Sequence, residues 1–162
     1  MKTKILFCIW VGCIGASLWL LFDSGQPDGW DRKSIYDESA DGSKQIADAL
    51  VIAKKENKLV LLQFGANWCI WCHRLHQFFE KDTAVRRKLE SNFLIILVDV
   101  SNGHNVSIVS QYVEVTQSGI PAIAVLDSDG KLIGSASSPD FVENGHYQSK
   151  KILGFLNGCI TK

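Results

Sequence analysis

The amino-acid sequence predicts an α/β fold, a three-layer sandwich in which helices cover both faces of a central mixed β-sheet. Helical patterns alternate along the chain with short apolar runs of strand length, and one hairpin signal adds an antiparallel pair. The chain has 162 residues, of which 46% are hydrophobic, so a single domain can bury a core of ordinary size.

The overall composition excludes several classes of protein. The 17 basic and 17 acidic side chains give a net charge of zero, whereas proteins that bind nucleic acid usually carry a basic excess. Thirteen glycines and three prolines exclude collagen-like and proline-rich disordered chains. Five cysteines are too few and too scattered for a small disulfide-stapled scaffold. We therefore expect a globular domain with no nucleic-acid partner.

The N-terminal segment is predicted to be a membrane anchor. Residues 5–22 form an uncharged apolar run of 18 residues, which as a helix would span about 27 Å. Lys2 and Lys4 precede the run and acidic residues follow it, a pattern that keeps the N-terminus inside and exports the rest. A cleaved signal peptide is the alternative, but the run ends at Asp23 without the small residues of a cleavage site.

This segment sets the expected localisation and domain boundaries. An anchored protein would lie on the periplasmic face of the inner membrane, and a cleaved one in the periplasm, where disulfides persist. Residues 23–42 are polar, with six acidic side chains, and are predicted to be a linker. The folded domain is then expected to occupy residues 43–162.

The first half of this domain shows helix, strand and helix patterns in turn. A helix is predicted from Ser43, with Asp41 or Ser43 as its N-cap. Residues 59–64 are apolar without alternation, which favours a strand buried on both faces. The pattern is helical again over residues 69–91, with a break near Asp82.

The second half adds a strand, a short helix, a hairpin and a closing helix. Residues 93–100 are rich in Ile, Leu and Val and predict a second buried strand. Residues 122–135 read as two strands joined by an Asp-Ser-Asp-Gly turn, and residues 152–159 show the apolar spacing of an amphipathic helix. The short helix is expected over residues 105–113, with three valines facing inward: Val106, Val109 and Val113.

The most informative motif is Cys69-Ile70-Trp71-Cys72, which follows a predicted strand and opens a helix. Unpaired backbone N–H groups and the positive end of the helix dipole favour a thiolate at Cys69, which predicts that Cys69 is the nucleophile. Cys72 lies one turn further along the same face, where it can close a disulfide with Cys69. A shielded second thiol attacks only after the first has formed a mixed disulfide.

Residues 61–72, Leu-Leu-Gln-Phe-Gly-Ala-Asn-Trp-Cys-Ile-Trp-Cys, resemble the active-site segment of the thioredoxin superfamily. Downstream, Gly119-Ile120-Pro121 resembles the loop whose cis-proline faces the dithiol in that family. The resemblance extends over residues 43–159. Within this range the sequence is similar to exported or membrane-anchored bacterial thioredoxin-like proteins. It implies a thioredoxin-like fold and a thiol–disulfide oxidoreductase, with Cys69 attacking and Cys72 resolving.

The resemblance also implies how substrate would bind. Pro121 is expected to be cis and, with Ile120, to offer backbone groups to an extended substrate chain. Trp68 is expected to pack beside the dithiol and Trp71 to be partly exposed, so that both shape a substrate groove. The expected substrates are cysteine-containing proteins, electrons are expected to pass to or from a membrane redox partner, and no organic cofactor or metal is required. We expect a monomer.

Two departures from the family pattern leave the direction of electron flow open. Thioredoxins carry a buried acid six residues before the first cysteine, where this chain has Gln63, which cannot take a proton. They commonly have Gly-Pro between the cysteines, where this chain has Ile70 and Trp71. Reductant, oxidant and isomerase all remain compatible with these residues.

Three rival interpretations of the motif remain. A copper- or zinc-binding module would use Cys69, Cys72 and the nearby His73 and His76, but adjacent residues point to different sides of a helix. Attachment of c-type haem would use Cys69–His73, but the only methionine is Met1. A purely structural disulfide is the third.

Four further side chains have ordinary expected roles. His73 and His76 are expected on a solvated helix face. Cys159 falls on the apolar stripe of the last helix and is expected to be a buried, inert thiol. Asp99 ends a predicted strand and is expected to cap the following loop.

Overall fold

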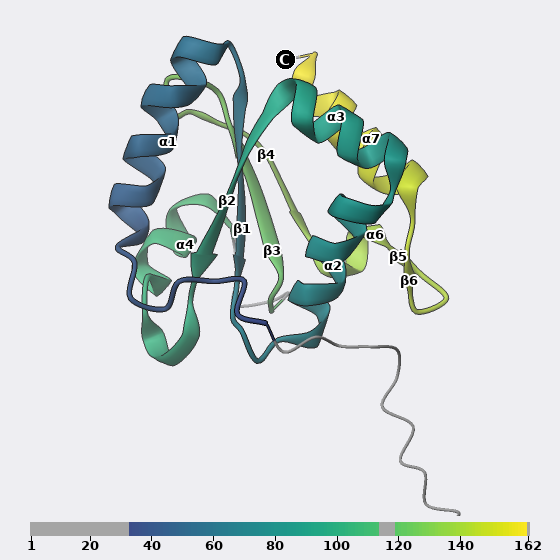
Figure 1. Ribbon diagram of the computed structural model, residues 1–162, viewed down its shortest axis with the longest axis horizontal. Coiled ribbons are helices and arrows are strands. Elements are labelled where there is room, and N and C mark those ends of the chain that lie inside the picture. Colours follow the sequence, from purple (N-terminus) through teal and green to yellow (C-terminus); the bar gives the residue numbers. More distant parts are fainter. Residues whose placement is uncertain (1–32, 114–118, 162) are drawn as a thin grey trace, which may run out of the picture. The chain divides into compact units, whose positions relative to one another are not determined.

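The computed structural model describes residues 33–113 and 119–161 (Figure 1). Their order of elements follows the predicted alternation of helices and strands. The helices are α1 (Gly42–Glu56), α2 (Ile70–Lys81), α3 (Thr83–Asn92), η1 (Ser101–Gly103), α4 (Val106–Tyr112), α6 (Ser138–Phe141) and α7 (Ser149–Ile160). The strands are β1 (Leu59–Gly65), β2 (Phe93–Asp99), β3 (Ala122–Leu126), β4 (Leu132–Ser137), β5 (Val142–Glu143) and β6 (His146–Tyr147).

The central sheet is mixed and has the strand order β2-β1-β3-β4. Strand β1 pairs in parallel with β2, from Leu59 opposite Phe93 to Gly65 opposite Asp99. It pairs antiparallel with β3, and β3 forms the predicted hairpin with β4. The mixed sheet of the sequence prediction is therefore confirmed.

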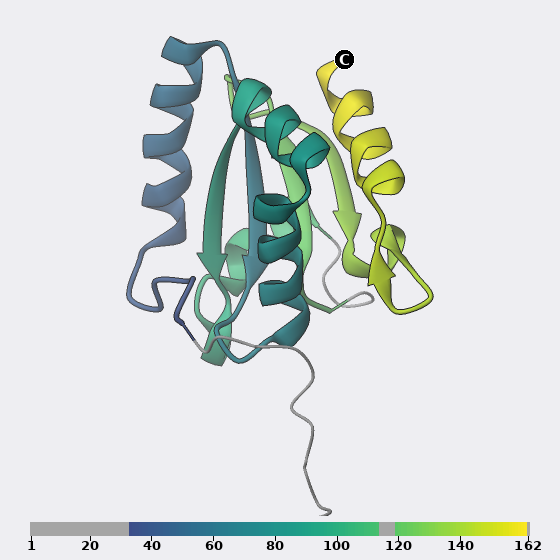
Figure 2. The same cartoon turned by 45° about the vertical axis from the view of Figure 1, so that its right-hand side comes forward.

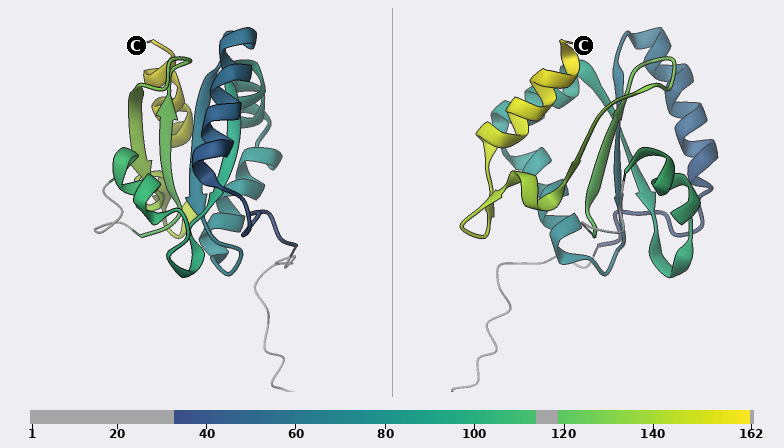
Figure 3. Two further views of the ribbon diagram at one scale, coloured as in Figure 1. Left: turned by 90° about the vertical axis from the view of Figure 1, so that its left-hand side faces the viewer. Right: turned by 180° about the vertical axis from the view of Figure 1, so that it is seen from behind.

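Helices cover both faces of this sheet, which confirms the three-layer sandwich (Figures 2 and 3). Because side chains alternate along a strand, β1 sends Leu61 to one face and Val60 and Leu62 to the other. The face of Leu61 packs against α2, α3 and α7, and the opposite face packs against α1 and α4. Strand β1 is buried along nearly its whole length, as its unbroken apolar run predicts.

The predicted break between α2 and α3 is confirmed at Asp82. The Asp82 N–H donates to the Phe78 carbonyl and closes α2. The Asp82 carboxylate accepts from the N–H groups of Ala84 and Val85 and so caps the start of α3. One residue thus ends one helix and begins the next.

The polar segment before α1 differs from the sequence prediction. The N-cap of α1 is Asp41, one of the two predicted candidates. However, Tyr36 is only 2% exposed and packs against the domain, so residues 33–42 belong to the fold and are not a free linker. Ile35 and Tyr36 form an apolar pair inside an otherwise polar stretch, and the burial of Tyr36 with the partial burial of Ile35 moves the start of the domain before residue 43.

The predicted anchor, residues 5–22, lies outside the described residues, as does the first half of the predicted linker, residues 23–32. Among residues 33–113 and 119–161, no helix is long and apolar enough to cross a membrane.

Two burial predictions are corrected. Strand β2 is only half-buried over residues 94–97, because it forms an edge of the sheet and has a neighbour on one side only. In α4, Val109 is buried as predicted, but Val106 is 49% exposed and Ile108 takes the inward position. Val106 is the first residue of this helix, and Val113, its C-cap residue, is partly buried against the same core.

Candidate active site

The two cysteines of the motif lie at the start of α2, directly after the end of β1. Cys69 is the N-cap residue of α2, and its Sγ accepts a hydrogen bond from the Cys72 N–H at 3.2 Å. The two side chains form a disulfide, with their Cα atoms 5.3 Å apart. Cys69 is 6% exposed, whereas Cys72 is fully buried. The pair is therefore asymmetric: only the first cysteine keeps any exposed surface.

The loop before β3 faces Cys69. The Ile120–Pro121 peptide bond is cis, which confirms that prediction. The Ile120 carbonyl oxygen lies 3.8 Å from Cys69 Sγ. Two contacts fix this loop: Ala122 pairs with Phe64 of β1, and the Pro121 carbonyl accepts from the Ser138 N–H at 3.1 Å.

A small hollow opens beside the dithiol. It has a volume of about 270 Å³ and is lined by Trp71, Ile120, Ser138, Pro139 and Val142. The structure therefore brings Trp71 and Ile120 together at one recess. The other walls come from α6 and β5, which the sequence analysis missed. The Ser137–Asp140 capping box and Pro139 are the signal that marks α6.

The two tryptophans that were expected to shape a substrate groove differ in their exposure. Trp71 is partly buried, with its ring edge-on to Tyr147 at 5.8 Å and the Arg74 guanidinium 4.9 Å from the ring centroid. The Tyr147 hydroxyl donates to the Trp71 carbonyl at 3.1 Å. Trp68 is 67% exposed, so the expectation that it packs beside the dithiol is wrong. It lies in the turn before α2, where its ring finds no place in the core.

The histidine predictions are also corrected. His73 is only 3% exposed, and its Nε2 lies 2.8 Å from the Asn67 carbonyl. Because a backbone carbonyl can only accept, Nε2 carries the proton, and this bond ties α2 to the preceding turn. His76 is half-buried and pairs with Glu80 at 3.4 Å. Burial lowers the pKa of His76, while the charge of Glu80 opposes that shift.

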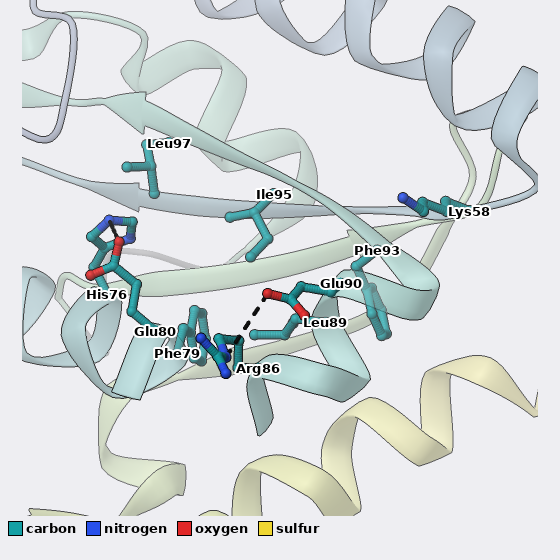
Figure 4. Close-up of a pocket in the computed structure, with 10 residues that line it drawn as sticks. All are labelled: Lys58, His76, Phe79, Glu80, Arg86, Leu89, Glu90, Phe93, Ile95 and Leu97. Carbon is teal, nitrogen blue, oxygen red and sulfur yellow. Dashed lines mark ion pairs between the residues drawn. The ribbon is translucent and has the colours of Figure 1, made fainter. Parts of the chain in front are cut away.

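His76 belongs to a different pocket, between α2, α3 and the β2 edge of the sheet (Figure 4). Its lining includes the buried side chains of Phe79 and Leu89 and the exposed side chains of Glu80 and Arg86. Neither cysteine of the dithiol lines it. The described parts of the chain hold no cluster of three or more His, Cys, Asp or Glu side chains placed to bind a metal ion.

A buried polar contact, missed by the sequence analysis, lies behind Cys72. Gln63 is fully buried, and its Nε2 donates to the Tyr36 hydroxyl at 2.6 Å and to the Cys72 carbonyl at 3.2 Å. Asn67 holds the segment of Tyr36 in place: its Oδ1 accepts from the N–H groups of Ile35 and Tyr36, at 3.0 and 2.9 Å. The Ile35-Tyr36 pair in a polar stretch is the only sequence signal for this contact.

Asp99 and Cys159 lie as predicted. Asp99 is 1% exposed, and its Oδ1 accepts from the N–H and hydroxyl of Ser101, so it caps the turn after β2. Cys159 is 3% exposed on the inner face of α7.

This fold, with a C-x-x-C disulfide at the start of α2 and a cis-proline loop facing it, places the chain in the thioredoxin class of proteins. The family model of the thioredoxin-like domain matches residues 46–144, more than half of the chain. The chain therefore belongs to the thioredoxin-like domain family.

Individual relatives agree with this assignment. The chain is 27% identical over 104 residues to the thiol:disulfide interchange protein DsbD of Vibrio vulnificus, covering 62% of this chain but only 16% of the relative. A disulphide isomerase from Xylella fastidiosa is 30% identical, with a TM-score of 0.67 over 80% of this chain and 98% of that one. The C-terminal domain of Neisseria meningitidis DsbD, at 22% identity and a TM-score of 0.51, shares the fold over 73% of this chain and 95% of that domain.

Proposed function

We propose that this protein exchanges disulfides with cysteine-containing proteins, with Cys69 as the attacking and Cys72 as the resolving cysteine. The observation that carries the proposal is the asymmetry of the pair: Cys69 reaches the surface at the N-cap of α2, whereas Cys72 is fully buried. The helix dipole and the unpaired N–H groups at this end favour a thiolate at Cys69.

The reaction divides into two exchange steps. In the reduced protein, the Cys69 thiolate attacks one sulfur of a client disulfide, the client S–S bond breaks, and one client thiolate leaves. Cys72 then attacks Cys69 Sγ in the mixed disulfide, and the second client thiolate leaves with the electron pair of the broken bond. The products are a reduced client and the Cys69–Cys72 disulfide. The same steps in reverse oxidise a client dithiol, so the direction depends on the redox partner.

The loop of Ile120 and Pro121 is the proposed docking site for the client backbone. The Ile120 carbonyl lies beside Cys69 Sγ, so an extended client strand running along this loop would bring its own sulfur to Cys69. The hollow beside Trp71 would accept an adjacent client side chain. Trp68, which is exposed next to Cys69 in the chain, offers an additional apolar contact.

The proposed location is the periplasmic side of the inner membrane, with residues 5–22 as the anchor and a membrane protein as redox partner. The charge pattern around the apolar run supports this orientation. Membrane fractionation with protease treatment of spheroplasts tests it: the full chain should sediment with membranes and be digested from outside, and recovery from the cytosol would exclude both anchor and signal peptide.

Trapping of clients tests the proposed roles of the cysteines. Cys72→Ala should leave attack intact and remove resolution, so mixed disulfides with client proteins accumulate through Cys69 on non-reducing gels. Cys69→Ala should trap nothing and should abolish turnover, and Cys159→Ser serves as the matched control that behaves like wild type. Two equivalent, merely destabilised cysteine variants would instead indicate a structural disulfide.

A further inference from the structure

The resolving step requires a thiolate at Cys72, in a position that disfavours one. Cys72 is fully buried, and burial in apolar surroundings raises the pKa of a thiol. At the position where thioredoxins carry an acid, Gln63 can neither take up a proton nor supply a charge. Some other group beside Cys72 has to stabilise its thiolate if the proposed second exchange step is to proceed.

The Tyr36 hydroxyl is the group that the fold places there. Tyr36 is 2% exposed and packs in one buried cluster with Ala66, Cys69 and Cys72. The hydroxyl and Cys72 Sγ both lie over Gly65, the last residue of β1. A methyl group added at Gly65 would collide with the Tyr36 hydroxyl and lie 2.8 Å from Cys72 Sγ. The missing side chain of Gly65 therefore lets the phenol and the sulfur approach each other.

Gln63 fixes the orientation of this hydroxyl. The Cys72 carbonyl can only accept, so the amide nitrogen of Gln63, and not its oxygen, faces Cys72 and Tyr36. The Tyr36 oxygen then accepts from Gln63 and keeps its own proton available to donate. Among the hydrogen bonds of residues 33–113 and 119–161, the Tyr36 hydroxyl makes no donation.

The surroundings of Tyr36 keep it protonated. Burial raises the pKa of Tyr36 well above its usual range, and the charges of Asp99 and Tyr147 act in the same direction, while the bond from Gln63 opposes them. Tyr36 is therefore a neutral donor at physiological pH and not a base. In the disulfide form, Cys72 Sγ is a weak acceptor, but a Cys72 thiolate is a strong one.

We propose that Tyr36 donates a hydrogen bond to the Cys72 thiolate during resolution and so replaces the missing buried acid by stabilising the thiolate directly. The inference rests on the proposed function. The proton of Cys72 leaves to water, and the thiolate, held by Tyr36, attacks Cys69 Sγ. The Cys69–Cys72 bond forms as the bond between Cys69 and the client breaks, and the leaving client thiolate takes up a proton from water.

Tyr36→Phe tests this role, because it removes the hydroxyl and keeps the buried ring. A hydrogen bond to a charged group corresponds to roughly a tenfold effect, so the resolving rate at pH 7 should fall about tenfold, with attack by Cys69 unchanged. In a Cys69→Ala background, a ¹³C titration of Cys72 Cβ should show its pKa rising by about one unit on Tyr36→Phe. Tyr112→Phe, a half-buried tyrosine on α4, is the matched control and should change neither quantity.

The outcomes separate this inference from the proposed function. The inference fails on its own if wild type exchanges disulfides and Cys72→Ala traps clients, yet Tyr36→Phe alters neither the resolving rate nor the pKa of Cys72. A slow resolving step in Asp99→Asn with a normal one in Tyr36→Phe would instead assign the role to the buried carboxylate.

Discussion

Gln63 illustrates how a single residue redirects the chemistry of a familiar site. It occupies the place of the buried acid, but it serves as a double donor that joins Tyr36 to the carbonyl of Cys72. Its Oε1 is buried without a hydrogen-bond partner among the described residues. The amide therefore holds Tyr36 in place and does not itself handle a proton.

Gln63→Glu should make the stability of the protein depend on pH. A carboxylate here would face the Cys72 carbonyl in a dry site, so its folded pKa would rise above the unfolded value of about 4.3. Because the folded pKa is raised, the variant keeps its free energy of unfolding below about pH 4 and loses it as pH rises. At neutral pH, the unpaired buried charge should lower the free energy of unfolding by about 3 kcal/mol. Urea unfolding at pH 4 and pH 7 measures the difference.

The matched control for this prediction is Gln111→Glu, on the exposed side of α4. It should leave the pH dependence of unfolding unchanged. Equal stability of Gln63→Glu and wild type at both pH values would mean that water or a rearranged Tyr36 solvates the carboxylate, contrary to the structure.

The sequence predicts some residues of the site better than others, for physical reasons. Cys69, Cys72 and Pro121 are visible because their chemistry depends on residue type and spacing. His73 and Trp68 were misplaced, because polarity alone indicates a solvated histidine and a buried tryptophan. Their positions depend on a turn in which the Asn67 carbonyl accepts from His73, a contact that no periodicity encodes.

At the scale of elements, Asp82 joins α2 and α3 and reaches a third helix. Its carboxylate caps α3 and accepts a hydrogen bond from the Ser149 hydroxyl at the start of α7. The bond from Ser149, with those from the N–H groups of α3, lowers the pKa of Asp82 below its usual range. This residue therefore fixes the helical layer that carries Cys72.

Asp82→Ala should lower the free energy of unfolding by about 1 kcal/mol at pH 7, the usual cost of losing an N-cap. Because the folded pKa of Asp82 is lowered, its contribution is present above the unfolded value of about 3.9 and lost as pH falls through the folded pKa. The difference in the free energy of unfolding between Asp82→Ala and wild type should therefore be smaller at pH 3 than at pH 7. Urea unfolding at the two pH values checks this.

Asp129→Ala is the control for this prediction, because Asp129 is an exposed acid paired with Lys54. Its urea midpoint should stay close to that of wild type, as exposed ion pairs contribute little. An Asp82→Ala protein as stable as Asp129→Ala at pH 7 would contradict the capping role.

The elements that the sequence did not predict are the shortest ones. Helix α6 has four residues, and β5 and β6 have two each, too few for any periodic pattern to emerge. They matter nonetheless, because Ser138, Pro139 and Val142 complete the hollow beside Trp71. Longer elements such as α1, β1 and α7 were predicted because an extended apolar pattern marks each one.

At the scale of the whole domain, the β1–α2 junction meets both covering layers. Strand β1 is central in the sheet and carries α1 and α4 on one face and α2, α3 and α7 on the other. The cysteine pair at its end therefore has a rigid base, while Cys69 still reaches the surface. This arrangement suits a disulfide that opens and closes without rearrangement of the fold.

The reduction potential of the Cys69–Cys72 pair tests the central claim most directly, since a redox-active disulfide and a structural one occupy different ranges. Equilibration of the purified protein with glutathione buffers, followed by thiol quantification, gives this value. We expect a potential between about −270 and −120 mV, the range of catalytic dithiols. A value near −270 mV would identify a reductant of client proteins, and a value near −120 mV an oxidant. A potential more negative than about −300 mV, where structural disulfides lie, would contradict the central claim.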